Sequence, residues 1–139
     1  MSVSTVGSSR VELSSRTAAL ALGDVLAILV FVVAGEYSHG IDPFVNVGRV
    51  GGTVAPFLIG WGLVAIIGGF YASRSRLSPG RTLAATFVGW VLAVVVAQLL
   101  RATEVFHGDA ALTFALVSTF VGGTLLCLWR VVATFIVSR

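Results

Sequence analysis

The sequence has no lysine and few charged residues of any kind. Aspartate, glutamate and arginine together make up 11% of its 139 residues, whereas 57% of the residues are hydrophobic. Soluble domains carry charge on roughly a quarter of their residues, so this composition excludes an ordinary soluble domain. The nine basic residues, all arginine, outnumber the six carboxylates. They form no basic stripe and no aromatic–basic motif, so we expect no nucleic-acid partner.

Cysteine is almost absent too, because Cys127 is the single cysteine. One cysteine excludes an intramolecular disulfide, and its place in an apolar run is typical of an inert buried thiol. The sequence also contains no HExxH or paired CxxC pattern, no phosphate-binding loop and no recognisable order of nucleophile and base. It therefore predicts no catalytic residue, cofactor or metal ligand, although these absences leave enzyme chemistry open.

What the sequence does contain is four long apolar runs. Crossing about 30 Å of hydrocarbon at 1.5 Å per residue takes about 20 mostly apolar residues. Every backbone polar group inside hydrocarbon must be satisfied within its own segment, so the runs predict helices. We expect an all-α bundle of four transmembrane helices over residues 17–139, preceded by a polar cytoplasmic tail over residues 1–16. The four spans are predicted at about 17–35, 54–72, 82–100 and 111–137.

The first run has an alternative interpretation as a cleaved signal peptide. Arg10 and Arg16 precede it, and it ends in the small residues Ala34 and Gly35, which is the order found in a secretory signal. The run is longer than the apolar core of such a signal, however, and Asp24 interrupts it. We therefore expect it to stay in the protein as a membrane span.

Arginine is distributed unevenly between the flanks of the predicted spans. One set of flanks comprises the N-terminal tail, the connection between the second and third spans, and the C-terminal end. It holds Arg10, Arg16, Arg74, Arg76, Arg81, Arg130 and Arg139, whereas the first and third connections hold Arg49 and Arg101. Because cytoplasmic flanks of membrane helices carry the excess of basic residues, we predict a multi-pass protein of the plasma membrane with both termini in the cytoplasm.

Small residues recur at four-residue spacing in the third and fourth runs. Lipid tails are as apolar as leucine, so membrane helices associate through close backbone approach at small residues. Such rows predict packing seams, although a chain this rich in alanine and glycine also produces some rows by chance. A seam would serve the bundle, a second copy of the chain or another membrane protein equally well. The predicted seam residues are Gly89, Ala93 and Ala97 in the third span and Thr119 and Gly123 in the fourth.

Two charged residues lie at membrane depth, where they are costly and usually paired or functional. Asp24 lies within the first span, and Arg130 lies within the fourth, which approaches the cytoplasm from the opposite direction. The two side chains can therefore form an ion pair in the cytoplasmic half of the bundle. Alternatively, Arg130 reaches the inner interface beside Trp129, and Asp24 is protonated or bonded to the hydroxyl of Thr124 or Thr134.

Polar residues also gather in the first and third connections, on the predicted outer side. If these connections meet, their carboxylates and imidazoles form a candidate site for a proton or a cation; a solvated acidic loop is the alternative. Glu36 and Arg101, each at an outer helix end, are also expected to form a structural ion pair. The residues of this outer-face cluster are Glu36, His39 and Asp42 after the first span and Arg101, Glu104, His107 and Asp109 after the third.

Several short motifs are spread along the chain. They are Asp24, Gly35-Glu36, Ser38-His39, Ala55-Pro56-Phe57-Leu58, Gly60-Trp61, Leu100-Arg101, Thr113-Phe114-Ala115 and Trp129-Arg130. Together, over about residues 20 to 132, they resemble the small integral membrane proteins grouped as domain of unknown function 3054. The resemblance implies a four-span bundle from an archaeal or bacterial plasma membrane, and it implies no activity.

Two classes of function fit this architecture. The first is a small transporter or permeation unit, in which Asp24 exchanges a proton or binds a cation and Gln98, Ser118 and Thr119 supply polar contacts. Because four short helices enclose little room, its pathway would form between the protomers of an oligomer. The second is a non-transporting accessory protein that binds another membrane protein, a lipid or a pigment. The sequence favours the first, because of its intramembrane carboxylate.

Overall fold

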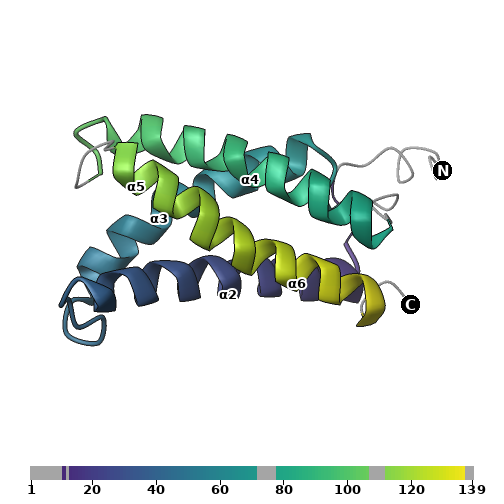
Figure 1. Ribbon diagram of the computed structural model, residues 1–139, viewed down its shortest axis with the longest axis horizontal. Helices are drawn as coiled ribbons and strands as arrows, with labels where there is room; N and C mark the ends of the chain where they lie inside the picture. Colours follow the sequence, from purple (N-terminus) through teal and green to yellow (C-terminus); the bar gives the residue numbers. More distant parts are fainter. Residues whose placement is uncertain (1–10, 12, 72–77, 107–111, 137–139) are drawn as a thin grey trace.

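The structure is a computed structural model that describes residues 11, 13–71, 78–106 and 112–136. These residues form helices joined by turns, and they contain no β-strand, only an isolated bridge between Val11 and Tyr71. The all-α prediction is therefore confirmed. The elements, drawn in Figure 1, are α2 (Ser15–Ser38), α3 (Val47–Ile67), α4 (Pro79–Arg101), α5 (Leu112–Val117), the π-helical turn η1 (Ser118–Gly122) and α6 (Gly123–Ile136).

Four helical segments are long and apolar enough to cross a membrane. α2 has 24 residues, α3 has 21 and α4 has 23, and α5, η1 and α6 run on as a fourth segment of 25 residues, Leu112–Ile136. About 20 residues suffice to cross the hydrocarbon of a bilayer. The four predicted transmembrane helices are confirmed, and the chain is a multi-pass membrane protein.

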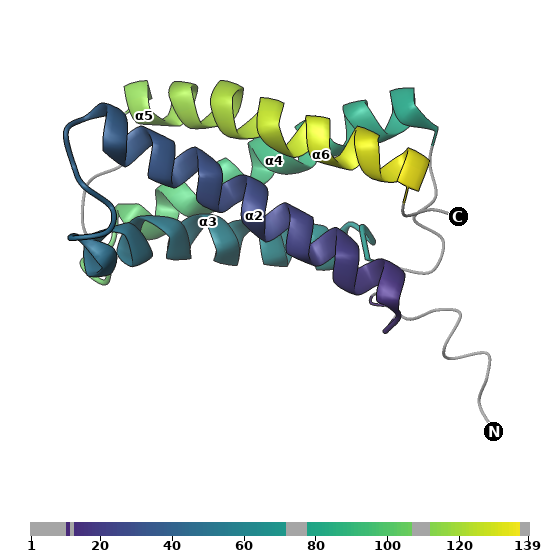
Figure 2. The same ribbon diagram turned by 90° about the horizontal axis from the view of Figure 1, so that it is seen from below.

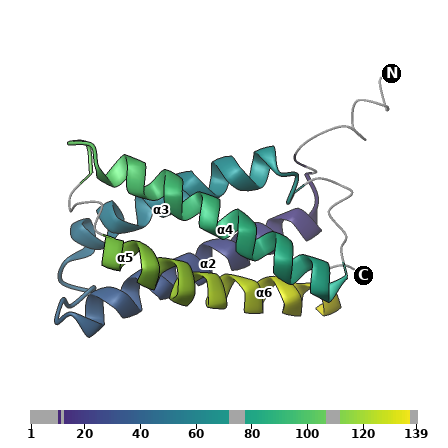
Figure 3. The same cartoon turned by 45° about the horizontal axis from the view of Figure 1, so that its top comes forward.

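The four segments form an antiparallel bundle in which each packs against two neighbours. α2 lies against α3 and α6, and α4 completes the ring by packing against the same two helices (Figures 1 and 3). Figure 2 shows the start of α2 and the end of α6 at one end of the bundle, the terminal end. The end of α2 and the start of α5 lie at the other, the connection end.

Serine and glycine define several of the helix ends. At the start of α2 the hydroxyl of Ser14 accepts the backbone N–H three residues further on, at 3.2 Å, and Ser78 does the same for α4 at 3.4 Å. Serine at this position satisfies an N–H that has no partner within the helix. α3 ends at Ile67 because the chain reverses at Gly69, whose φ of 77° is a conformation that glycine adopts without strain.

The bounds of the second span differ most from the prediction. α3 begins at Val47 and ends at Ile67, whereas the sequence predicted a span over 54–72. The predicted spans left residues 48–52 in the first connection, but these residues form the first turns of the helix, where Arg49 pairs with Glu36 of α2. Pro56 therefore lies in the helix interior. The other three predicted spans agree with the helices to within three residues at each end.

Aromatic rings fill the middle of the bundle. Phe57 and Trp90 stack with their ring centroids 5.7 Å apart, and Phe31 meets them edge-on at 5.3 and 6.3 Å. Trp61 and Phe114 extend this cluster. Phe57 and Trp90 are completely buried, so rings occupy the interior space that a pathway through a single bundle would need.

The predicted seam of the third span lies inside the bundle. Gly89, Ala93 and Ala97 are all buried in α4. Here α3 comes so close that a Cβ on Gly60 would lie 2.5 Å from the backbone oxygen of Ala93. The small residues therefore allow backbone contact between α3 and α4, as expected of membrane helices.

The fourth segment contains one wide turn, η1, which lies beside Trp90 of α4. A Cβ on Gly122 would lie 2.6 Å from a ring carbon of Trp90, so the glycine leaves room for the indole. Trp90 Nε1 donates to the backbone oxygen of Ser118 at 2.9 Å. Of the two predicted seam residues in this span, Gly123 is buried, whereas Thr119 is partly buried and its hydroxyl donates to a carbonyl of its own helix.

Candidate functional site

A buried ion pair joins the first span to the last. Asp24 of α2 is fully buried, and Arg130 of α6 is 5% exposed. Arg130 Nε donates to Asp24 Oδ1 at 2.9 Å, and Nη2 donates to Oδ2 at 2.6 Å. Two parallel bonds of this kind are the strong form of an arginine–carboxylate contact. The structure thus brings together the two charged residues that the sequence places at membrane depth.

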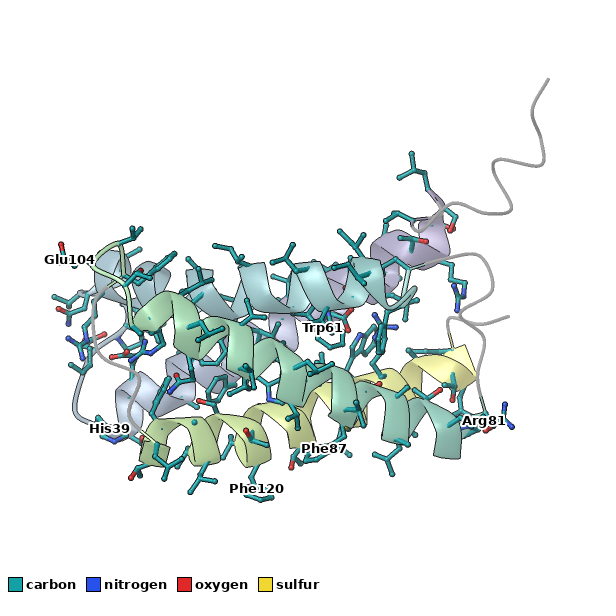
Figure 4. All side chains as sticks on the ribbon, turned by 90° about the horizontal axis from the view of Figure 1, so that it is seen from above. His39, Trp61, Arg81, Phe87, Glu104 and Phe120 are labelled. Atoms are coloured by element: carbon teal, nitrogen blue, oxygen red, sulfur yellow. The ribbon has the colours of Figure 1, made fainter. Side chains whose placement is uncertain are left out.

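Two further donors reach the same carboxylate, Trp61 from within α3 and Tyr71 from the turn that follows it. The hydroxyl of Tyr71 donates to Asp24 Oδ2. Trp61 Nε1 lies 3.4 Å from Oδ2 and 3.0 Å from the Tyr71 hydroxyl, and Figure 4 shows the Trp61 side chain between the helices. Asp24 therefore accepts two bonds from Arg130, one on each oxygen, and a third from Tyr71 on Oδ2. The single N–H of Trp61 lies closer to the Tyr71 hydroxyl than to Oδ2.

The turn that ends α3 places Tyr71 in the site. After Gly69 the chain folds back, and the backbone N–H of Phe70 donates to the carbonyl of Ala65 at 2.8 Å. The carbonyl of Phe70 in turn accepts from Arg130 Nη1 at 3.4 Å. The guanidinium carbon lies 5.5 Å from the ring centroid of Phe70 and 5.1 Å from that of Tyr71. These distances are within the range of cation–π attraction, so the site surrounds the cation as well as the carboxylate.

The residues expected beside Asp24 and Arg130 if the two do not pair make other contacts. Trp129 Nε1 donates to the carbonyl of Leu20 in α2 at 3.3 Å. The hydroxyls of Thr124 and Thr134 donate to carbonyls of their own helix at 2.6 and 2.7 Å. The hydroxyl that does reach Asp24 belongs to Tyr71.

Neither Tyr71 nor Trp61 is among the residues that the sequence predicts for this site. A signal for Tyr71 is the pair Gly68-Gly69 just before it, because two glycines in an apolar run indicate a turn. When the chain reverses at the end of a helix, the residues after the turn lie beside the helix that they follow. A signal for Trp61 is its indole N–H, which requires an acceptor when it is buried.

The structure gives Glu36 a different partner from the one expected. Glu36 Oε2 accepts from Arg49 Nε of α3 at 3.0 Å, and Oε1 accepts from the hydroxyl of Thr53 at 3.2 Å. Arg101 is buried, with its guanidinium carbon 4.3 Å from the ring centroid of Phe114. The expectation missed Arg49 because it placed residue 49 in a loop rather than in the first turn of α3.

Two other residues of the outer-face cluster, His39 and Glu104, lie apart. His39 is exposed, and its Nδ1 lies 2.8 Å from the carbonyl oxygen of Gly35 at the end of its own helix. Glu104 is exposed too, and Figure 4 places it away from His39 at the connection end. Over the described ranges no three histidine, cysteine or acidic side chains are grouped so that they could hold a metal ion. His107 and Asp109 lie outside the described residues.

The three polar residues suggested for a transport pathway are distributed over two helices. Ser118 is fully buried, and its hydroxyl donates to the carbonyl of Phe114 at 2.6 Å. Thr119 donates to a carbonyl of the same helix, and Gln98 is partly buried in α4. The two hydroxyls therefore bond to the backbone of their own span.

Comparison with known proteins identifies a family for this chain. The model of a family described as Protein of unknown function (DUF3054) matches residues 21–133. No curated protein and no solved structure is similar enough to this chain to count as a match.

Proposed function

Since the chain belongs to the DUF3054 family of proteins of unknown function, we propose its function from the geometry: a non-transporting accessory protein of the membrane. In this role the four spans keep a fixed arrangement. The lateral surface of the bundle, which faces the surrounding membrane, binds another membrane component. That surface suits such binding because every span exposes large hydrophobic side chains. A second copy of the chain or another membrane protein remains a proposed partner.

The buried ion pair of Asp24 with Arg130 carries this proposal. A carboxylate that binds a transported cation, or loads and releases a proton, must be free of a fixed cation that already neutralises it. Asp24 is fully buried and accepts from Arg130, Tyr71 and Trp61. An arginine stays charged at any ordinary pH, so the pair is neutral as a unit. This arrangement supports a structural ion pair more than a transport site.

Flux measurements test the proposal. Purified protein in liposomes is expected to pass no protons or potassium ions above the level of empty liposomes, because Arg130 already neutralises the buried Asp24. A trapped pH-sensitive dye reports the proton gradient, and ionophore-treated vesicles show that the gradient can be read. Asp24→Asn, checked for helix content by circular dichroism, is measured beside the wild type. A wild-type flux that Asp24→Asn abolishes would overturn the proposal in favour of a transporter.

We also propose that the terminal end faces the cytoplasm of a prokaryotic cell and that the membrane is the plasma membrane. The excess of arginine in the corresponding flanks supports this orientation. Ser78 and Glu104 are exposed at opposite ends of the bundle, so each can carry a single cysteine in a Cys127→Ser background. In intact cells a membrane-impermeant maleimide is expected to label Glu104→Cys, and to label Ser78→Cys only after lysis. The reverse pattern would contradict the orientation.

A further inference from the structure

A groove of about 810 Å³ runs between α3 and α4 on the lateral surface of the bundle. Along α4 it extends from Arg81 to Val96, which is about 22 Å at the rise of an α-helix. Small residues of α4, Ala84 and Ala85, leave it hollow. Its walls are the apolar side chains of Leu63 and Ile67 from α3 and Val88 and Leu92 from α4.

One end of this groove is positively charged. Arg81, which lines the groove, is exposed and lies at the terminal end, as Figure 4 shows. It stands in the first turn of α4, which begins at Pro79, and the start of a helix attracts anions through its N–H groups and its dipole. Among the described residues the one carboxylate in this half of the bundle is Asp24, which Arg130 already neutralises.

We propose that the groove binds one phospholipid with an anionic headgroup. An acyl chain lies between α3 and α4, and the headgroup phosphate lies against Arg81 and the start of α4. The site is separate from the Asp24 carboxylate, so the inference rests on the chain being a membrane protein and not on the absence of transport.

The dimensions and the charge both favour a lipid over a second copy of the chain. The groove is longer than half of the roughly 30 Å hydrocarbon thickness, so a chain that enters from the terminal end is covered over the whole depth of its leaflet. A second copy would bring its own apolar helices, but its described residues offer Arg81 no free carboxylate at the terminal end. Anionic lipids supply that charge, and they are enriched in the cytoplasmic leaflet, which the proposed orientation places at Arg81.

Lipid retention tests this site. Purified protein in detergent is mixed with phosphatidylglycerol or phosphatidylcholine of the same acyl chains, and native mass spectrometry counts the lipids that remain bound. One phosphatidylglycerol is expected per chain, held about fivefold more tightly than phosphatidylcholine, because one arginine near an anionic headgroup has that effect. Arg81→Gln is expected to remove this preference. Ala84→Leu is expected to lower the retention of both lipids, because it fills the groove.

Two matched controls keep the test specific. Arg49→Gln made together with Glu36→Gln removes an arginine at the connection end without leaving an unpaired charge, and Ala18→Leu enlarges an exposed alanine of α2 outside the groove. Both are expected to retain lipid as the wild type does. Equal retention of the two lipids by the wild type, or an unchanged preference in Arg81→Gln, would overturn the proposal. So would a dimer in the same spectra that Ala84→Leu converts to monomer, because a second copy would then fill the groove. Each result is independent of the flux measurement.

Discussion

Arg130→Met is expected to lower the free energy of unfolding of the bundle by about 3–5 kcal/mol. The substitution leaves Asp24 as a fully buried carboxylate without its cation, and one unpaired charge in the interior is far costlier than either a complete pair or none. Unfolding by sodium dodecyl sulfate in mixed micelles, followed by circular dichroism, measures the loss. Arg81→Met, which removes an exposed arginine, is the matched control and is expected to change stability by no more than about 0.5 kcal/mol.

The double variant separates the pair from its parts. Asp24→Asn with Arg130→Met removes both charges. Its loss of unfolding free energy is therefore expected to be smaller than the sum of the losses in the two single variants. Directly bonded residues show interaction energies of about 0.5–3 kcal/mol in such cycles. Losses that add to within about 0.5 kcal/mol would mean that the two side chains do not meet in the membrane.

Gly60→Ala is expected to destabilise the bundle by about 1–3 kcal/mol, although alanine is the better helix former. The new Cβ would lie 2.5 Å from the backbone oxygen of Ala93. A backbone atom cannot rotate away as a side chain can, so α3 and α4 would have to separate. The same unfolding assay reads this effect.

Gly62→Ala is the control for this prediction. Gly62 lies in the same helix, but a Cβ there would meet nothing within 4 Å. The change is expected to be neutral or to stabilise the protein by up to about 1 kcal/mol, because glycine is costly inside a helix. If both alanine variants behaved alike, the close contact between α3 and α4 would be contradicted.

The fold could be predicted because a bilayer sets the length of whatever crosses it. Four runs of sufficient length predicted four helices, and the structure has them. The start of α3 could not be predicted in the same way. Its first turns contain Gly48, Gly51 and Gly52, which intrinsic propensity assigns to a loop. The contact that supports those turns, Arg49 with Glu36, comes from a helix that precedes α3 in the chain, and a local pattern does not show such a contact.

The candidate site was predictable only in part for a related reason. The depth of a charge in a span can be counted along the sequence, and this placed Asp24 near Arg130. The contact of Tyr71 with Asp24 depends on the φ of 77° at Gly69. Two consecutive glycines can adopt many kinds of turn, so the sequence does not indicate this one. The seam of α4 was predictable from its spacing alone, because Gly89 and Ala93 follow the regular repeat of an unbroken helix.

The wide turn η1 rotates the side chains that follow it in the last span relative to those that precede it. Sixteen residues separate Phe114 from Arg130, which at about 100° per residue puts them about 160° apart on a regular α-helix, on nearly opposite sides. A π-helical turn takes up one extra residue and reduces that angle to about 60°. Phe114 can then reach Phe57 while Arg130 reaches Asp24. A helical wheel drawn straight through residues 112–136 would turn one of these two side chains toward the lipid.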